Sequence, residues 1–269
     1  MDRRKTVACY RRNVQTDAMP TSHQDGAARS GVIGATWLGR VPYREAWALQ
    51  KRLAGQRADD AIGDCLLLLE HPPVLTLGRH ADERHVLADA AELGRRGIEV
   101  IRVERGGEVT YHGPGQLVAY PILGLADRGL LLRPLVRGLE AAMAETCAAF
   151  GVAAGRRDGH PGCWSEAEGP LPRKIGALGI RVERGVSYHG IALNIAPDLA
   201  AFDLIDPCGV PGLVSTSIAA ELRRSGADET PATAAHAVAR AADLFAARLA
   251  EQLDAPLAWD SAPAMAATA

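Results

Sequence analysis

One cysteine of this sequence lies in a context that favours a reactive thiol. Cys208 stands between Pro207 and Gly209, which predicts a tight turn and not the interior of a helix or strand. A thiol on a constrained turn is accessible enough to attack an electrophilic carbon once it has lost its proton. Most cysteines are structural, and Cys147, which recurs with apolar residues at helical spacing, is predicted to be one. Cys208 is therefore the candidate nucleophile, and a structural role is its alternative.

Lys174 is the candidate partner for such a thiol. It opens a segment, Lys174 to Val182, in which apolar residues alternate with small or charged ones, and this pattern predicts a strand. An ammonium group held beside a thiol favours deprotonation of that thiol, and the pair can then act as base and acid. Most lysines at strand ends are solvated surface residues, so the residues alone leave both roles open.

The stretch from Arg105 to Ile122 concentrates glycine and polar side chains. Gly106 and Gly107 permit backbone conformations and close approaches that a Cβ atom would forbid. Gly113 to Gly115, with a proline between the glycines, predicts a tight turn, so the preceding Thr110 to His112 should lie at a strand end, where functional side chains are often placed. A glycine-rich hairpin whose tyrosine and histidine merely fill one face is the alternative.

The remaining pattern predicts an α/β fold that positions these residues. Apolar or alternating runs predict strands, and helical spacing of apolar residues predicts helices. Several strands are joined by short connections, so we expect a mixed, largely antiparallel sheet with flanking helices. The strands are expected at 31–39, 64–69, 74–77, 98–103, 116–123, 174–182 and 186–195, and helices at 89–96, 133–150 and 233–253. A further helix should follow Pro42, and another, capped by Ser215 or Thr216, should run to Arg224.

No repeat or linker divides the chain between residues 31 and 255, which are expected to form a single domain. Residues 1–30 are arginine-rich, polar and irregular, and are expected to be a disordered N-terminal extension. Residues 256–269 are expected to be a C-terminal tail.

Composition excludes several functional classes. The formal net charge is −2, whereas a dedicated nucleic-acid binder is usually strongly basic. No apolar run approaches the length of a membrane span. The five cysteines form no CxxC pair and the eight histidines show no metal-ligand spacing. We therefore expect reduced thiols, no metal site and a cytoplasmic location.

Three segments, in this order along the chain, resemble the octanoyltransferases of lipoate biosynthesis: Arg105–Ile122, Arg173–Asn194 and Asp206–Val210. The run from Glu70 to Arg79 is similar to that family as well. The resemblance implies the fold shared by biotin-protein ligases and lipoate-protein ligases. It also implies that residues 31–255 are a catalytic acyltransferase domain.

By this resemblance, Cys208 carries the acyl group as a thioester, and Lys174 promotes ionisation of the thiol and serves as acid and base. The implied walls of the acyl site are Arg105, Gly106, Gly107, Glu108, Val109, Thr110, Tyr111 and His112, then Ala177, Leu178 and Gly179, and then Gly190, Ile191 and Ala192. The small residues suit a narrow apolar slot, and backbone N–H groups beside glycines can polarise a thioester carbonyl. No cofactor is implied, because transfer from a thioester to an amine is downhill and needs no ATP.

The implied donor is octanoyl-acyl carrier protein. The implied acceptors are lysines of the lipoyl domains of 2-oxoacid dehydrogenases and of the glycine cleavage H protein, and no nucleic acid or membrane takes part. Both classes of partner are generally acidic, so docking should use a local basic patch. The candidates for this patch are Arg79, Arg133, Arg137, Arg156, Arg157 and Arg173.

Two other classes of protein are alternatives. An ATP-dependent lipoate-protein or biotin-protein ligase activates its acid as an adenylate and has no need of a nucleophilic cysteine. A non-catalytic acyl-binding relative would be expected to lack Cys208 or Lys174, and this chain has both.

Four further residues carry expectations of their own. Gly176 stands where the family usually has alanine, and Cys163 where an aliphatic residue is commoner. Cys163 is expected to pack in the core, with a competing thiol in the pocket as the alternative. His71, which precedes two prolines, is expected to be a turn histidine, and His189 is expected to orient a neighbour and not to act as a base.

Overall fold

A computed structural model describes residues 31–210, 212–226 and 234–260. The strands are β1 (Ile33–Arg40), β2 (Asp64–Glu70), β3 (Val74–Leu77), β4 (Glu99–Arg102), β5 (Val109–His112), β6 (Gln116–Ile122), β7 (Gly155–Arg157), β8 (His160–Ser165), β9 (Arg173–Glu183), β10 (Val186–Asn194) and β11 (Leu257–Trp259). The α-helices are α1 (Tyr43–Ala58), α2 (Ala90–Arg95), α3 (Leu132–Ala149), α4 (Ile218–Arg224) and α5 (Ala234–Gln252). Three 3₁₀ segments complete the described part: η1 (Glu83–His85), η2 (Leu199–Leu204) and η3 (Pro207–Gly209).

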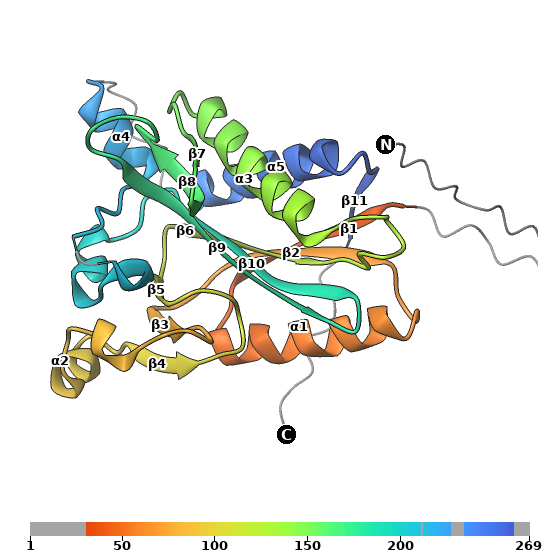
Figure 1. Ribbon diagram of the computed structural model, residues 1–269, viewed down its shortest axis with the longest axis horizontal. Coiled ribbons are helices and arrows are strands. Elements are labelled where there is room, and N and C mark those ends of the chain that lie inside the picture. Colours follow the sequence, from red (N-terminus) through yellow and green to blue (C-terminus); the bar gives the residue numbers. More distant parts are fainter. Residues whose placement is uncertain (1–30, 211, 227–233, 261–269) are drawn as a thin grey trace, which may run out of the picture. The chain divides into compact units, whose positions relative to one another are not determined.

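The strands of the described part form two sheets. The large one has eight strands in the order β11-β1-β2-β6-β10-β9-β8-β7, and the small one has three in the order β4-β3-β5. In the large sheet, β1 pairs in parallel with β11 and β2, and the other neighbours pair antiparallel. The predicted mixed, largely antiparallel α/β fold is confirmed (Figure 1).

Helices cover both faces of the large sheet. α3 and α5 pack on one face and α1 packs on the other (Figure 1). Five apolar residues predicted α3, and four of them are fully buried in the larger of the two resulting cores: Leu135, Leu139, Met143 and Cys147. The fifth, Phe150, is partly buried against the same core. A helix whose apolar side chains recur every three or four residues has one continuous face to bury, and the sheet provides the matching surface.

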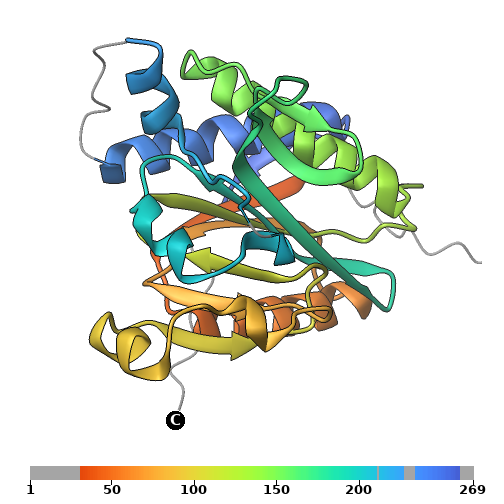
Figure 2. The same cartoon turned by 60° about the vertical axis from the view of Figure 1, so that its left-hand side comes forward.

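The small sheet is joined to the centre of the large one. β5 ends at His112, and after the turn at Gly113–Gly115 the chain continues as β6. Figure 2 shows η2 and η3, in cyan, lying over the small sheet, and η2 contributes Phe202 and Leu204 to the core of that sheet. This arrangement brings η3, with Cys208, against β5.

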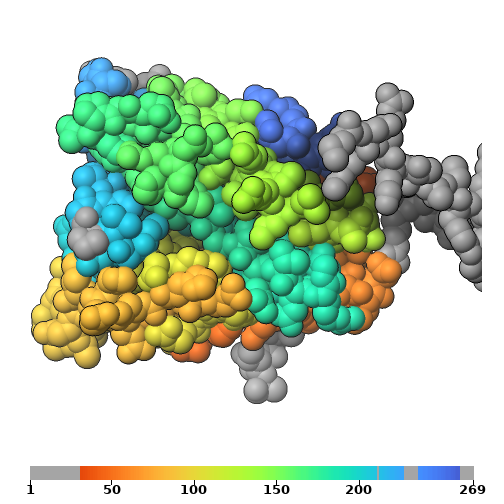
Figure 3. Space-filling model, in the orientation of Figure 1, coloured from red at the N-terminus to blue at the C-terminus, as the bar shows by residue number. Residues whose placement is uncertain are grey.

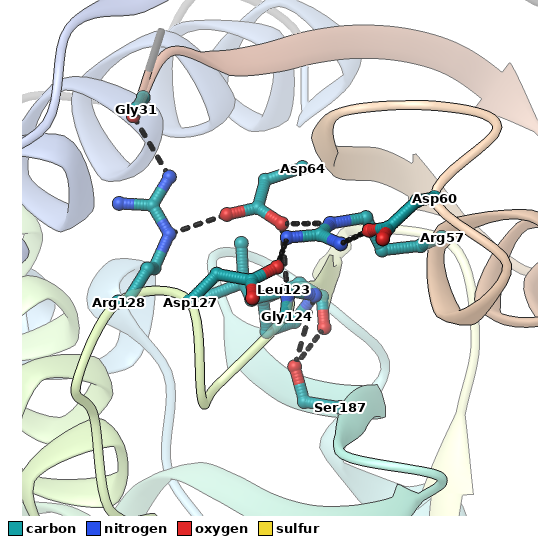
Figure 4. Close-up of polar contacts among 10 residues, drawn as sticks. Gly31, Arg57, Asp60, Asp64, Leu123, Gly124, Asp127, Arg128 and Ser187 are labelled. Carbon is teal, nitrogen blue, oxygen red and sulfur yellow. Dashed lines mark hydrogen bonds and ion pairs between the residues drawn. The ribbon is translucent and has the colours of Figure 1, made fainter. Parts of the chain in front are cut away.

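A buried ion-pair cluster closes the end of the structure where β2 begins. The Arg57 guanidinium donates to Asp64 at 2.6 Å and pairs with Asp127, and Arg128 pairs with the other oxygen of Asp64 (Figure 4). Asp64 also accepts from the backbone N–H of Gly124 at 2.9 Å. Because these groups come from α1, β2 and the segment between β6 and α3, the cluster ties three parts of the chain together.

Two predictions about elements are wrong. Residues 257–259, predicted to belong to a tail, form β11, which pairs with the edge strand β1 at Ile33–Ala35. Three residues are too few to show a strand pattern, and β11 exists because β1 offers an unpaired edge. The cap of α4 is Ser217, whose hydroxyl accepts from the N–H of Ala220 at 3.1 Å, and not Ser215 or Thr216.

Three of the predicted segments fall partly or wholly outside the described residues: the extension at 1–30, the end of the tail at 261–269, and Thr233 at the start of the last helix. Within residues 31–210, 212–226 and 234–260, no helix is long and apolar enough to cross a membrane.

Candidate active site

Cys208 lies on a turn with unusual backbone geometry. Its φ of 60° and ψ of 19° are in the left-handed region, which residues other than glycine rarely occupy. The turn is closed by hydrogen bonds from the N–H of Gly209 to the carbonyl of Asp206, at 2.9 Å, and from Val210 to Pro207, at 3.1 Å. Such a conformation costs roughly 1–3 kcal/mol and persists only where the surroundings enforce it. The turn holds the Cys208 side chain half-exposed at the opening of a cavity.

The Lys174 side chain reaches this thiol across 34 positions of sequence. Its Nζ atom lies 3.1 Å from the Cys208 Sγ and 3.0 Å from the carbonyl oxygen of Pro161, to which it donates. The ammonium also lies over the ring of Trp164, 5.1 Å from the ring centroid. A carbonyl and an aromatic face both stabilise a cation, so these contacts hold the charged end of Lys174 against the thiol.

The backbone of Lys174 is fixed by a segment that follows η3. The N–H of Lys174 donates to the carbonyl of Val214 at 2.8 Å, and its carbonyl accepts from the N–H of Thr216 at 2.9 Å. The carbonyl of Thr216 in turn accepts from the Asn194 amide at 2.9 Å, and the Asn194 oxygen accepts from the Gln116 amide at 2.9 Å. Asn194 and Gln116 are buried partners across β10 and β6.

The same hydrogen-bonded chain continues into the wall of the cavity. The oxygen of Gln116 lies 2.8 Å from His112 Nδ1, and because a carboxamide oxygen only accepts, that nitrogen carries the proton. His112 Nε2 is then the acceptor for the Thr76 hydroxyl, at 3.4 Å. Thr76 also accepts from Arg105, at 2.9 and 3.2 Å. Five buried residues, namely Thr76, His112, Gln116, Asn194 and Thr216, thus link the guanidinium of Arg105 to the backbone of Lys174. Each hydrogen bond in such a chain strengthens its neighbours.

A buried ion pair secures the other side of Lys174. Arg173 donates to both carboxylate oxygens of Glu221 at 2.8 Å, and Thr216 and Ser165 donate to the same carboxylate. The hydrogen bonds from Arg173 lower the pKa of Glu221 to about 2. Arg173 is therefore buried in the structure, and the prediction that it belongs to a docking patch is wrong.

Cys208 and Lys174 open onto a cavity of about 420 Å³. This size is typical of sites for small molecules. The walls come from β5 and the preceding glycine-rich stretch, from β9 and β10, and from the first turns of α3. Figure 3 shows a part of the teal β9–β10 hairpin in a hollow between the green surface above it and the yellow surface of the small sheet below it, while the turn of the hairpin lies at the surface.

Most residues predicted to bind the acyl group line this cavity. They are Arg105, Gly106, Gly107, Glu108, Val109, Thr110 and His112 on one side, and Ala177, Leu178, Gly179, Gly190, Ile191 and Ala192 on the other. Tyr111 does not: it packs in the core of the small sheet, with its ring 5.4 Å from that of Phe202. Alternate side chains of a strand point to opposite faces, so Tyr111 turns away where Thr110 and His112 turn in. The prediction that Tyr111 binds substrate is corrected accordingly.

Two glycines of the walls are required by close backbone contacts. A Cβ atom on Gly179 would lie 2.6 Å from the carbonyl oxygen of Gly106, and one on Gly190 would overlap the carbonyl oxygen of Ala119. The first contact lets the glycine-rich stretch lie directly on β9, where the Gly106 N–H donates to the carbonyl of Ile180 at 3.3 Å. The glycines therefore set the width of the cavity by letting backbones meet.

The end of the cavity away from Cys208 is polar. His189 is only 1% exposed, and neither ring nitrogen has a hydrogen-bond partner among the described residues. His189 pairs with Ile180 in the β9–β10 ladder, and Ala192, near the thiol, pairs with Ala177. The two pairs are three residues apart, so His189 lies about 10 Å from the Ala192 pair along the strands. Burial lowers the pKa of His189 to about 4, so the ring is neutral at pH 7.

Residues 42–240 match the family model of the lipoyl protein ligase A/B catalytic domain. Over 189 residues the chain is 47% identical to an octanoyltransferase of Chloroflexus aggregans, covering 70% of this chain and 84% of the relative. The chain belongs to the lipoyl protein ligase A/B family. It is also 45% identical over 221 residues to an octanoyltransferase of Mycobacterium bovis, covering 81% of this chain and 91% of that one.

A solved structure agrees on the fold. The lipoate protein ligase of Thermoplasma acidophilum aligns with 87% of this chain and 89% of its own, with a TM-score of 0.57 and 14% identity. At this identity the similarity establishes the fold alone.

The departure from the octanoyltransferase pattern at Cys163 concerns the core and not the cavity. Cys163 is fully buried and packs in the main core beside Cys147, and it does not line the cavity. A hydrogen bond with Cys163, together with burial, raises the pKa of the Cys147 thiol. Two fully buried thiols that do not line the cavity cannot compete with Cys208 for an acyl group.

His71 lies in the turn between β2 and β3, as predicted, and its side chain is fully buried and hydrogen-bonded. Its Nδ1 donates to the carbonyl of Val41 at 2.7 Å, so its Nε2 accepts from the hydroxyl of Tyr120 at 2.7 Å. Tyr120 lines the cavity, and His71 thereby fixes the orientation of a wall residue. Burial lowers the pKa of His71 to about 4.

Several residues of the site were not singled out by the sequence analysis. Thr76, Gln116 and Asn194 lie within segments that resemble the octanoyltransferases, but their strand patterns are ordinary. Tyr43 and Leu132 lie in the first turns of helices, where no pattern marks them. Among the described residues, no group of three His, Cys, Asp or Glu side chains is placed to hold a metal ion.

Proposed function

We propose that this chain is an octanoyltransferase that moves an octanoyl group from an acyl carrier protein to a lysine of a lipoyl domain, through a thioester on Cys208. The observation that carries the proposal is the 3.1 Å contact between Lys174 Nζ and Cys208 Sγ at the opening of the cavity. Relatives that are 45–47% identical carry the name octanoyltransferase. The cytoplasmic location expected from the free thiols stays a prediction.

The first half of the reaction loads the enzyme. Lys174, as the free amine, accepts the proton of the Cys208 thiol, and the thiolate attacks the carbonyl carbon of the donor thioester. The new S–C bond forms as the bond to the carrier sulfur breaks. The ammonium of Lys174 then gives its proton to the departing carrier thiolate, so Lys174 acts as base and then as acid.

The second half of the reaction forms the amide. The free amine of the acceptor lysine attacks the thioester carbon, and the bond to Cys208 Sγ breaks. Lys174 accepts the proton that the amine loses and returns it to the Cys208 thiolate, which restores the starting enzyme. Because a thioester is replaced by an amide, no ATP is consumed.

The cavity supplies the binding energy for the acyl chain. Leu178, Ile191 and Ala192 present apolar surface along its length, and each methylene group buried there contributes about 0.8 kcal/mol. An extended octanoyl chain reaches from the thiol to the region of His189, about 10 Å away along β10.

Intact-mass measurement after incubation with octanoyl-acyl carrier protein tests the proposal. We expect the mass to rise by one octanoyl group, with the adduct on the peptide that contains Cys208, and no adduct on Cys208→Ala. Addition of a lipoyl domain should then remove the octanoyl group and acylate the domain without ATP. An adduct on another residue would refute the assignment of the nucleophile. An absolute requirement for ATP would identify a ligase, and binding of octanoyl without transfer would identify a non-catalytic relative.

A further inference from the structure

The amino end of α3 exposes apolar side chains. Leu131, at the N-cap position, is 73% exposed, and Leu132, the first residue of the helix, is 47% exposed. Arg133 and Arg137 follow one helical turn apart, and both are exposed. Neither arginine forms an ion pair with any residue of the described ranges. We call these four residues the α3 surface.

The α3 surface is unfavourable for the helix that carries it. Leu131 makes no side-chain hydrogen bond to the open N–H groups of the first turn, whereas serine or aspartate at that position stabilises a helix by about 0.5–2 kcal/mol. The first turn holds no acidic residue, and its Arg133 faces the positive end of the helix dipole. Two like charges four residues apart, as at Arg133 and Arg137, destabilise a helix by roughly 0.2–0.5 kcal/mol. Local violations of this kind are typical of functional surfaces.

The α3 surface reaches the acyl cavity through Leu132. Leu132 and Val136 line the cavity, as do Gly159, His160 and Pro161 at the turn between β7 and β8. The carbonyl of Pro161 is the one that holds Lys174 Nζ, so the α3 surface lies on the Lys174 side of the reacting pair. Figure 2 shows α3, in light green, beside the β7–β8 hairpin.

We propose that the α3 surface is the docking site of the acyl carrier protein that delivers the octanoyl group. The proposal rests on the proposed function. The carrier is acidic, so its carboxylates complement two arginines that have no ion-pair partner in the described part of the chain, and its apolar side chains cover Leu131 and Leu132. Surface charges of this kind accelerate the encounter of oppositely charged proteins by roughly 10- to 1,000-fold at low salt.

The charges on this side of the opening favour the donor over the acceptor. The acceptor domain is acidic as well, but it must bring a lysine amine, which is a cation in solution, towards Cys208, and Arg133 and Arg137 repel that amine. The opposite side of Cys208 is different: Glu108 lines the cavity, and both Glu108 and His85 lie close to Gly209. The donor, which brings no cation, has no such conflict with the α3 surface.

The proposal is tested by reversing the charges and comparing two donors. In the variant with Arg133→Glu and Arg137→Glu, we expect kcat/KM for acylation of Cys208 by octanoyl-acyl carrier protein to fall by about tenfold or more at low salt. Acylation by octanoyl-N-acetylcysteamine, a small neutral thioester, should stay within about twofold, because the cavity and the reacting pair are unchanged. The variant with Arg223→Glu and Arg240→Glu is the matched control, since it changes the net charge equally at exposed positions near the other end of α3, about 27 Å away.

A second variant distinguishes a docking role of Leu131 from a structural one, because docking predicts opposite changes in melting temperature and in kcat/KM. Leu131→Ser introduces a good N-cap, so its melting temperature should rise while its kcat/KM with the carrier protein falls. A purely structural role for Leu131 would move both quantities in the same direction.

Three outcomes would overturn the docking proposal. The charge-reversed variant could react normally with the carrier protein, or lose activity equally with the small thioester. It could also acylate normally and then fail to transfer octanoyl to the lipoyl domain, which would assign the α3 surface to the acceptor. Failure of the unmodified enzyme to react with either donor would instead refute the proposed function, so the two failures are distinguishable.

Discussion

At the scale of single residues, the site depends on the thiol of Cys208 and the amino group of Lys174, which are positioned in different ways. Cys208 is placed by a left-handed backbone turn, which fixes its side chain without any side-chain partner other than Lys174. Lys174 is placed by its own contacts, to the carbonyl of Pro161 and the ring of Trp164. The thiol is therefore positioned by the backbone, and the ammonium by its neighbours.

Lys174→Arg separates the two roles proposed for Lys174. A guanidinium keeps the positive charge but cannot give up its proton near neutral pH. We expect the variant to retain part of the rate of Cys208 alkylation by iodoacetamide and to lose transfer to the acceptor amine by at least about 100-fold. Because both residues serve the same step, the double variant with Cys208→Ala should be no worse than Cys208→Ala alone. Near-normal turnover of Lys174→Arg would show that the lysine acts through its charge alone.

At the scale of elements, two antiparallel neighbours of β10 bring the catalytic strand and the cavity into one unit. β9 supplies Lys174, and β6 supplies Gln116, whose amide meets Asn194 at the end of β10. The Asn194 amide donates a hydrogen bond to the carbonyl of Thr216, and the N–H of Thr216 donates to the carbonyl of Lys174. Asn194 is thus a positioning residue that touches neither the thiol nor the ammonium directly.

Asn194→Ala should impair catalysis beyond its effect on stability. The change removes two buried hydrogen bonds and leaves the carbonyl of Thr216 unpaired, at a cost of roughly 1–3 kcal/mol. Ser187→Ala is the matched control, because Ser187 is a buried hydrogen-bonding residue of the same strand, far from Lys174. We expect similar losses of melting temperature in the two variants, but a loss of acylation rate of about tenfold or more only in Asn194→Ala.

The pH dependence of Cys208 alkylation distinguishes positioning from stability, because a loss of folding stability alone would not shift it. In Asn194→Ala, the rise of the alkylation rate should move to higher pH, because Lys174 is less well held beside the thiol. Asn194→Asp, which keeps the shape but cannot donate to Thr216, should behave in the same way. If the alkylation rate of Asn194→Ala depended on pH in the same way as that of Ser187→Ala, Asn194 would not be a positioning residue.

At the scale of the whole molecule, three buried histidines link folding to pH: His112 and His189 line the cavity, and His71 lies behind the wall residue Tyr120. Burial lowers the pKa of His71 and His189 to about 4 and that of His112 well below its ordinary value of 6.5. Between pH 6.5 and about 4 the unfolded chain therefore binds more protons than the folded one. Folding stability should be fully present above pH 6.5 and should fall as the pH drops through this range.

We expect the free energy of unfolding to fall between pH 7 and pH 5 by roughly 1–2 kcal/mol for each of these histidines. His71→Gln keeps a neutral hydrogen-bonding side chain at this position. In this variant, the fall in the free energy of unfolding between pH 7 and pH 5 should be smaller by about the contribution of one histidine. Urea unfolding at pH 7, 6 and 5 measures both slopes. The ion pair between Arg173 and Glu221 does not affect this comparison. The pKa of Glu221 is about 2 in the folded protein, so the stability that the pair contributes is lost only below about pH 4.5. Equal stability at pH 7 and pH 5 would contradict the assignment of neutral histidines.

The sequence by itself determined the elements and the reactive turn. The stripe along α3 and the β9–β10 hairpin were predictable because their signals are local, with side chains repeating every three to four residues in a helix and every two in a strand. The turn at Cys208 was predictable for a related reason, since proline and glycine on either side of one residue leave few backbone conformations open. The resemblance in three short segments pointed to the same cavity walls.

Only the tertiary structure decided which polar residues meet. Asn194 and Gln116 lie 78 positions apart, and Lys174 and Cys208 lie 34 apart. No local pattern encodes such pairs, because they depend on strand order and register. The same reason explains why Arg173 turned out to be buried on Glu221 while Arg133 and Arg137 are exposed, although the three looked alike in the sequence. It also explains β11, whose three residues become a strand only because the edge of β1 is there to pair with them.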